Sequence, residues 1–332
     1  MALEKFLDAW PQLAEGVYEP LGFGRTHWTR LVRTPAEKFI LRIYSPDVSL
    51  DKIHAELALL ERLQAQALPF AIPMPIANRG GQKLTTVRQE GKVQQAVLWG
   101  YIPGENADFS DQAQAVSAGK ALGQLSAALN ALTGEMEAST LPNPSCQQML
   151  DDAIGLPEFF AHLADLPIEA TKRKAVSDLI QQVHAQTPAW YASLPRQIIH
   201  NDFIPGNVLV EGSQVSGVVD FESHRYDLRI MDLVVPLCHW PYDLYGTGDE
   251  WPIVDALGSG FARYQTLLPE EIQTLPQLMR LRWAVNVTYF LGRTLSGSVP
   301  VNVLEMFMDG ALKNERWVGK NSAALIQLAS NW

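Results

Sequence analysis

The segment "HNDFIPGN", residues 200–207, brings together side chains suited to proton transfer and metal binding. It places His200, Asp202 and Asn207 in the spacing H-x-D-x-x-x-x-N, and Asp220 follows thirteen residues after Asn207. A carboxylate such as that of Asp202 can accept the proton of a hydroxyl group. Amide and carboxylate oxygens, as in Asn207 and Asp220, are ligands that a hard cation such as Mg2+ prefers. The pattern therefore predicts metal-assisted chemistry on an alcohol.

The residues between Asn207 and Asp220 predict the element that positions both side chains. The runs "NVLVE" and "QVSGVVD" favour strands, and Gly212 lies between them, as is typical of a β-hairpin. Such a hairpin brings Asn207, at the start of one strand, close to Asp220, at the end of the other. Positioning an alcohol, accepting its proton and holding metal ions on nucleotide phosphates are together the requirements of phosphoryl transfer.

Length, charge and cysteine content narrow the class of protein. The 332 residues exceed the usual size of one compact core and favour two lobes. The formal net charge of -10 argues against a general nucleic-acid binder. Cys146 and Cys238 match no metal-binding or disulfide spacing. The chain shows neither a signal peptide nor a membrane-spanning apolar run, so we expect a cytoplasmic protein without a membrane partner.

Strand and helix patterns divide the chain near residues 101–105. Before this point, strands are predicted within 17–44 and 83–105, with a helix that begins after Ser49 and has an apolar face. After it, helices dominate. They are predicted at 112–132, 146–163, 169–191, 230–238, 252–267, 275–296 and 302–315.

The form "HNDFIPGN…VVDFE" resembles the catalytic loop and metal motif of the protein-kinase-like superfamily. It is most similar to the small-molecule branch, which includes aminoglycoside phosphotransferases, type II homoserine kinases and choline kinases. The resemblance extends over about residues 15–320 and implies a two-lobed, protein-kinase-like α+β fold. It implies a nucleotide-binding lobe at 1–101 and a catalytic and substrate-binding lobe at 102–332. The implied reaction moves the γ-phosphoryl group of ATP or GTP, with Mg2+, to a hydroxyl of a small molecule.

The same resemblance implies a role for each residue of the motif. Asp202 matches the catalytic base, and His200 matches the catalytic-loop histidine, which is mainly structural. Asn207 and Asp220 match the metal ligands. Asp232 matches an aspartate that usually braces the catalytic loop.

Arg42 departs from the family pattern. The third strand of the family carries a lysine, and Arg42 occupies that place in "FILRIY". Glu56, on the first long helix, matches the acidic partner of that lysine. Arginine keeps the charge and can bind phosphate oxygens through two N–H groups, so we expect Arg42, steadied by Glu56, to contact the α- and β-phosphates. The departure also leaves open a catalytically inactive nucleotide-binding module.

The resemblance marks two further parts of the nucleotide site. The segment "VLWGYIPGE" matches the hinge, where backbone groups from Trp99 to Tyr101 would meet adenine. Gly22 and Gly24, in "GFGRTHW", match the phosphate loop, although the full GxGxxG pattern is absent. A plain turn is the alternative reading of these glycines.

The acceptor is the least determined part of the prediction. In the resembling families, residues 238–251 face the acceptor pocket, and Trp240, Tyr242 and Asp243 could hold a cationic or amino-alcohol substrate. Ordinary wall packing is the alternative. Homoserine, an aminoglycoside, a choline-like alcohol and a sugar all stay open, as does the oligomeric state. A bacterial Ser/Thr protein kinase is the rival activity, but the segment after "DFE" is short and no APE-like segment follows it.

Overall fold

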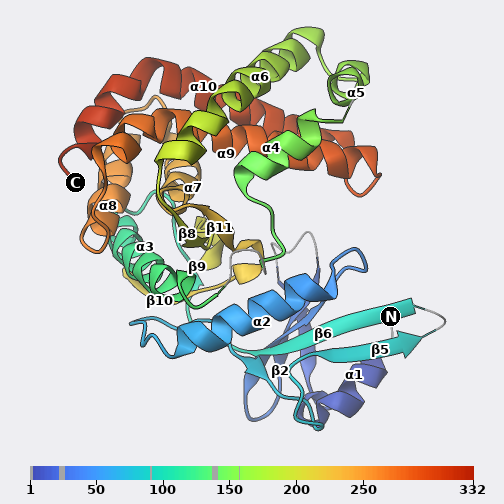
Figure 1. The fold of residues 1–332 in the computed structure, drawn as a ribbon. Coiled ribbons are helices and arrows are strands. Elements are labelled where there is room, and N and C mark those ends of the chain that lie inside the picture. The colour runs from blue at the N-terminus through green and yellow to red at the C-terminus, as the bar shows by residue number, and fades with distance from the viewer. Residues whose placement is uncertain (1–2, 22–26, 90–91, 137–140, 157) are drawn as a thin grey trace. The chain divides into compact units, whose positions relative to one another are not determined.

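The computed structural model of the chain describes residues 3–21, 27–89, 92–136, 141–156 and 158–332. The N-terminal part holds an antiparallel sheet and the C-terminal part is mainly helical, which confirms the α+β class (Figure 1). Backbone contacts group the chain into two compact units. The division into lobes at 1–101 and 102–332 stays a prediction. Unit 1 comprises Met1–Asn106, Gly206–Glu211 and Val215–Glu222, and unit 2 comprises Ala107–Pro205, Gly212–Gln214 and Ser223–Trp332.

A six-stranded antiparallel sheet forms the body of unit 1. Its order is β1-β2-β3-β6-β4, and β5 pairs with β6. A turn joins β2 to β3, in which the backbone N–H of Thr34 donates to the carbonyl of Glu37 at 2.9 Å. The strands are β1 (Val17–Pro20), β2 (Trp28–Arg33), β3 (Lys38–Ile43), β4 (Pro75–Ile76), β5 (Thr85–Gln89) and β6 (Lys92–Gly100).

Helix α2 (Leu50–Gln64) begins where the sequence predicts it. The side chain of Ser49 accepts a hydrogen bond from the backbone N–H of Lys52, which satisfies one of the unpaired donors of the first turn. Buried residues follow at the three- and four-residue spacing of one helix face, and they include Glu56. The helix thereby carries one buried carboxylate within an otherwise apolar face.

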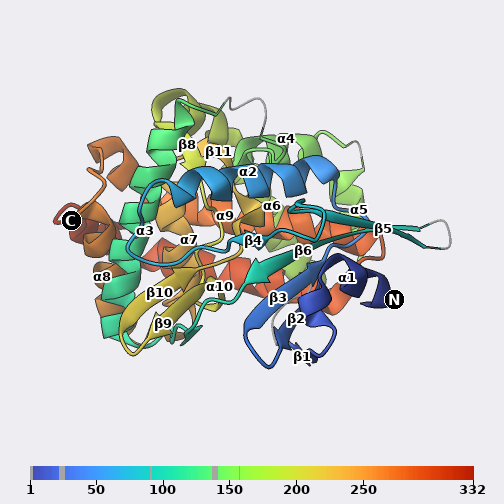
Figure 2. The same cartoon turned by 90° about the horizontal axis from the view of Figure 1, so that it is seen from below.

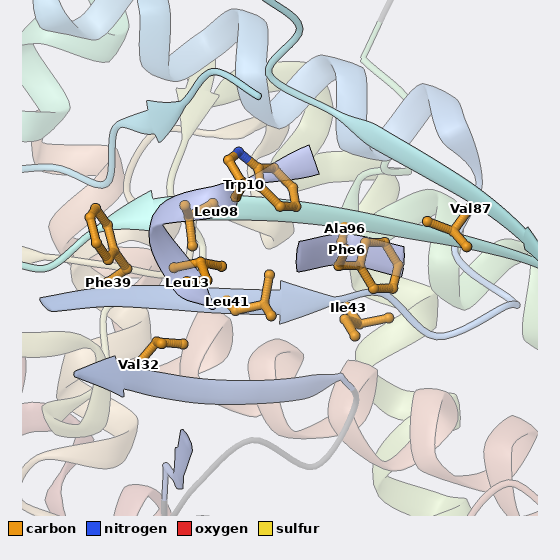
Figure 3. Close-up of a cluster of buried hydrophobic side chains, with 10 residues drawn as sticks. All are labelled: Phe6, Trp10, Leu13, Val32, Phe39, Leu41, Ile43, Val87, Ala96 and Leu98. Carbon is orange, nitrogen blue, oxygen red and sulfur yellow. The ribbon is translucent and has the colours of Figure 1, made fainter. Parts of the chain in front are cut away.

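The core of unit 1 lies on one face of the sheet. Helix α1 (Leu3–Ala9) and a short 3-10 turn (Pro11–Leu13) cover that face and contribute Phe6, Trp10 and Leu13 (Figure 3). The indole N–H of Trp10 donates to the carbonyl of Ile76 at 3.1 Å. Because side chains alternate along a strand, the intervening residues of the same strands point to the opposite face of the sheet and lie outside this core. The strand residues of the core are Val32, Phe39, Leu41, Ile43, Val87, Ala96 and Leu98.

Helices make up most of unit 2, and the largest departures from the predicted bounds occur in two places. The helix predicted at 146–163 is two helices, because Gly155 ends the first of them. The last helix continues to Ala329, well past residue 315, because buried residues recur at helical spacing over its second half. The helices are α3 (Gln112–Thr133), α4 (Cys146–Ile154), α5 (Phe159–Asp165), α6 (Ala170–Ser193), α7 (Met231–His239), α8 (Glu250–Ala262), α9 (Pro269–Leu295) and α10 (Val301–Ala329).

Helices α3 and α8 lie side by side at close range (Figure 2). A Cβ atom at Gly119 would lie 2.5 Å from the carbonyl oxygen of Leu257, and one at Gly123 would lie 2.6 Å from that of Phe261. Both positions therefore require glycine. Within the ranges that the structure describes, no helix has the length and apolar character needed to cross a membrane.

Candidate active site

The predicted motif is divided between the two compact units. Asn207 and Asp220 belong to unit 1, whereas His200 and Asp202 belong to unit 2. The nucleotide residues and the catalytic loop are therefore described separately below.

A hairpin brings the two predicted metal ligands together in unit 1. Strands β9 (Val208–Glu211) and β10 (Gln214–Val218) pair beside β7 (Glu105–Asn106), and Gly212 turns between them at φ 63°. The backbone N–H of Val219 donates to the carbonyl of Asn207 at 2.9 Å, immediately before Asp220. Asp220 has φ 69°, a left-handed conformation that is rare for a residue with a side chain and often marks functional sites.

Asn207 and Asp220 line a cavity of about 380 Å3 in unit 1. The strand register explains its wall: Leu31, Ile40 and Trp99 are cross-strand neighbours and share the face opposite the core. This wall is apolar, while the other end of the cavity is polar. A mainly apolar lining with a few polar groups at one end is typical of a small-molecule or cofactor site. The cavity is also lined by Thr29, Arg42, Glu56, Pro73, Tyr101 and Leu209.

Arg42 lies among three carboxylates at the polar end. Its guanidinium is 3.3 Å from Oδ1 of Asp220, 3.6 Å from Oε1 of Glu56 and 3.7 Å from Oε2 of Glu222. Burial alone would lower the pKa of Arg42, but the negative charges of Asp220 and Glu56 outweigh it and raise that pKa. The predicted Arg42–Glu56 pair is present, although its role in nucleotide binding stays a prediction.

Glu56 is held in an environment that opposes its charge. Burial raises the pKa of Glu56 to about 7, although the nearby guanidinium of Arg42 favours the ionised form. The hydroxyl of Tyr44 donates to its Oε2 at 3.1 Å. Three acidic groups thus lie around the guanidinium of Arg42, and a bound cation would relieve their repulsion.

Glu222, which sequence reasoning passed over, ties the motif to the segment before β2. Nε2 of His27 lies 2.5 Å from Oε2 of Glu222, and Nδ1 of His27 accepts from the backbone N–H of Ser45 at 3.2 Å. Nδ1 therefore carries no proton, and Nε2–H donates to the carboxylate. Burial favours a raised pKa for Glu222, but His27 and Arg42 hold that pKa below its usual value. The signal available in the sequence was the third residue of "DFE".

The donors at this end suit a divalent cation that also binds phosphate. Asn207 and Asp220 offer the amide and carboxylate oxygens that Mg2+ prefers. Among the residues that the structure describes, no group of three or more His, Cys, Asp or Glu side chains could hold a metal ion. Mg2+ is usually bound through one or two carboxylates together with phosphate oxygens and water, and phosphate oxygens and water would complete the coordination here.

In unit 2, backbone hydrogen bonds set the conformation of the catalytic loop. The loop follows β8 (Arg196–Ile199), which pairs with β11 (Arg225–Leu228). Oδ1 of Asp232 accepts from the backbone N–H groups of His200 at 2.9 Å and Asn201 at 3.1 Å. Asn201 has φ 63°, and the backbone N–H of Asp202 donates to Nδ1 of His200 at 3.2 Å. The predicted bracing contact of Asp232 is thus present in the structure.

Asp232 is fully buried within α7, and burial raises its pKa to about 7. The two backbone hydrogen bonds oppose this rise, and the charge of Asp227 adds to it. Asp227 itself has a structural role: Oδ2 accepts from the backbone N–H of Cys146 at 2.7 Å, at the start of α4.

Arg282 contacts Asp202, and sequence reasoning missed this pair. Nη2 of Arg282 lies 3.3 Å from Oδ1 of Asp202. The side chain of Arg282 is 9% exposed and that of Asp202 is 26% exposed. The available signal was a charged residue inside the apolar run "LRWAVNVTYFL" of α9.

The residues predicted to hold the acceptor differ in their exposure. Trp240 is fully buried. Tyr242 is partly buried, with its ring 5.5 Å from that of Trp283, and Asp243 is exposed. Their contact with an acceptor stays a prediction.

Trp99 and Tyr101, the residues of the predicted hinge, lie in unit 1 and line the cavity. Their contact with adenine stays a prediction. Gly22 and Gly24 lie outside the described residues.

Comparison with known proteins places this geometry in context. The model of the phosphotransferase enzyme family (APH) matches residues 17–265. A homoserine kinase of Gluconobacter oxydans is 30% identical over 251 residues, which cover 75% of this chain and 73% of the relative.

Two solved structures share the fold at low sequence identity. A microcompartment-associated aminopropanol kinase has a TM-score of 0.74 at 17% identity, covering 97% of this chain and 98% of the other. An amicoumacin kinase in complex with AMP-PNP, Ca2+ and Ami has a TM-score of 0.68 at 14% identity, covering 96% and 95%. The predicted protein-kinase-like α+β fold is confirmed.

Proposed function

The chain belongs to the phosphotransferase enzyme family, and on that premise we propose that it transfers the γ-phosphoryl group of ATP to a hydroxyl of a small molecule. The observation that carries the proposal is the cavity of unit 1, whose apolar wall ends at Arg42, Asn207 and Asp220. A structural neighbour holding AMP-PNP and Ca2+ supports a nucleotide with a divalent cation. GTP is the alternative phosphoryl donor.

In the proposed reaction, the acceptor oxygen forms a bond to the γ-phosphorus as the bond from that phosphorus to the β–γ bridging oxygen breaks. Asp202 orients the acceptor hydroxyl and takes its proton.

Asn207 and Asp220 would hold Mg2+ on the nucleotide. When bound, the cation neutralises phosphate charge as the transferred group moves. Arg42 would turn part of its hydrogen-bonding capacity from Asp220 to the α- and β-phosphates, and Glu56 would keep the guanidinium oriented. The loose ion pairs of Arg42, at 3.3 to 3.7 Å, support such an exchange of partners.

A panel assay tests the proposal. Phosphoryl transfer from ATP and from GTP would be measured with Mg2+ or EDTA, using L-homoserine, 3-amino-1-propanol, an aminoglycoside and a generic protein as acceptors. We expect Mg2+-dependent transfer to at least one small molecule and none to the protein. Transfer to the protein would favour a protein kinase. Nucleotide binding without transfer to any acceptor would favour an inactive module.

A further inference from the structure

Arg282 is a buried cation that forms a single ion pair among the described residues. It lies on α9 between Leu281 and Trp283, which are both buried. Its ion pair with Asp202, at 3.3 Å, uses Nη2, and among the described residues its Nε has no hydrogen-bond partner. Burying a guanidinium is costly unless acceptors surround it. The carboxylate of Asp202 is 26% exposed, so it offsets only part of the cost of burying the guanidinium of Arg282.

Two ring nitrogens close to Arg282 have no hydrogen-bond partner among the described residues. His239 is buried, and burial, together with the charge of Arg282, lowers its pKa to about 3, so the ring is neutral. Its ring centroid lies 5.4 Å from that of Trp283. Among the described residues, neither Nε2 of His239 nor Nε1 of Trp283 has a hydrogen-bond partner. This part of unit 2 therefore favours an anion over a cation.

The aromatic residue predicted to receive a cationic acceptor already faces a cation of the chain. Nζ of Lys313 lies 4.1 Å from the ring centroid of Tyr242. Asp243, which would attract an ammonium group, is 66% exposed and lies 3.9 Å from the same Nζ. The cation–π position at Tyr242 is thus filled by Lys313.

We propose that Arg282 binds a carboxylate of the phosphoryl acceptor, so that the acceptor is a small hydroxy acid or hydroxy amino acid. A guanidinium can serve two partners at once, because it presents five donors in a fixed plane. One edge would keep its contact with Asp202 and the other would hold the acceptor carboxylate. The hydroxyl at Asp202 and the carboxylate at Arg282 then lie only a few bonds apart, which selects a small molecule. This inference rests on the proposed function and names its substrate class.

The test compares two acceptors that differ only in the carboxylate, L-homoserine and 3-amino-1-propanol. In wild type we expect kcat/KM to be higher for L-homoserine. Arg282→Gln should lower this value for L-homoserine by about 10- to 100-fold, the range for losing a charge-assisted hydrogen bond, and mainly by raising KM. The value for 3-amino-1-propanol should change much less.

Arg280→Gln is the matched control on the same helix. Arg280 is equally buried, and its guanidinium contacts Glu315 instead of the catalytic loop. The Arg280→Gln variant should weaken folding without changing the preference between the two acceptors. Arg282→Lys keeps the charge and should retain part of the preference for L-homoserine. If Arg282→Gln does not fold, Arg282→Lys replaces it in the comparison. An equal fall in kcat for both acceptors in Arg282→Gln would mean that Arg282 only positions Asp202, and the proposal would be wrong.

A binding measurement separates this inference from the proposed reaction. L-2-aminobutyrate and propylamine carry no hydroxyl and differ by the same carboxylate, so calorimetry with them requires no turnover. We expect wild type to bind L-2-aminobutyrate more tightly than propylamine, and Arg282→Gln to abolish the difference. That outcome would support the carboxylate site even if no phosphoryl transfer were found. Equal binding of both compounds to wild type would overturn it.

Discussion

In unit 1 the carboxylates of Glu56, Asp220 and Glu222 lie around the guanidinium of Arg42, whereas in unit 2 the guanidinium of Arg282 forms one ion pair among the described residues, with Asp202. In the first group the acidic side chains outnumber the guanidinium, whereas in the second group one carboxylate faces one guanidinium. A cation added to unit 1 and an anion added near Arg282 would each reduce the imbalance. The two regions therefore favour ligands of opposite charge.

The two regions also differ in what holds them. The acids of unit 1 are connected through side chains, whose contacts can be exchanged when a ligand binds. The catalytic loop of unit 2 is held by backbone N–H groups that donate to Asp232, and these bonds must persist through a reaction. We therefore expect substitutions in unit 1 to change nucleotide binding, and substitutions in unit 2 to change turnover or folding.

The largest expected effect is on turnover in Asp202→Asn. The change keeps the size of the side chain but removes the charge and the proton acceptor, so kcat should fall by about 10² to 10⁴. ATP affinity, measured by nucleotide titration, should stay nearly unchanged. Asp220→Asn is its counterpart in unit 1 and should impair Mg–ATP binding and turnover together. If Asp202→Asn turned over like wild type, the assignment of the base would be wrong.

A smaller loss is expected for Arg42→Ala. Removing a charge-assisted contact to phosphate should lower kcat/KM for ATP by about 10- to 100-fold, equivalent to about 1.5–3 kcal/mol. Arg42→Lys should recover only part of it, because one ammonium replaces a two-pronged contact. Steady-state kinetics with varied ATP measures both. An unchanged kcat/KM would show that Arg42 does not hold the phosphates.

Asp232 predicts a pH effect on folding stability. Its pKa is about 7 in the folded protein, against 3.8 as the ordinary value, so the folded state retains a proton that the unfolded state has lost. The free energy of unfolding should therefore fall as pH rises from about 4 to about 7. Asp232→Asn is neutral throughout and keeps an oxygen acceptor, so this fall should shrink by about 4 kcal/mol. Denaturant titrations across that range measure it. A slope equal to that of wild type would contradict the assignment.

The smallest signal is expected from Mg2+ alone. Two protein oxygens hold Mg2+ weakly, because this ion relies on water and phosphate oxygens for the rest of its coordination. Calorimetry should show negligible affinity for Mg2+ without nucleotide and clear binding with it. Tight binding to the nucleotide-free protein would contradict the coordination proposed for Asn207 and Asp220.

Sequence reasoning succeeded where contacts are local along the chain. The hairpin around Gly212 and the cap at Ser49 depend on residues only a few positions apart, so their signals are complete within a short segment. The helix bounds were less well predicted. The last helix was cut short, because burial against other helices maintains its second half where the predicted pattern had stopped.

The residue types and spacing of "HNDFIPGN" and "DFE" by themselves determined the family, the α+β class and the candidate base and metal ligands. Only the tertiary structure decided which partners these residues have. Arg282 lies 80 residues from Asp202, and His27 lies 195 residues from Glu222. Such pairs leave no periodic trace in the sequence, because packing and burial in the folded chain bring them together. Tertiary packing also buries Trp240 completely, and burial raises the pKa of Asp232.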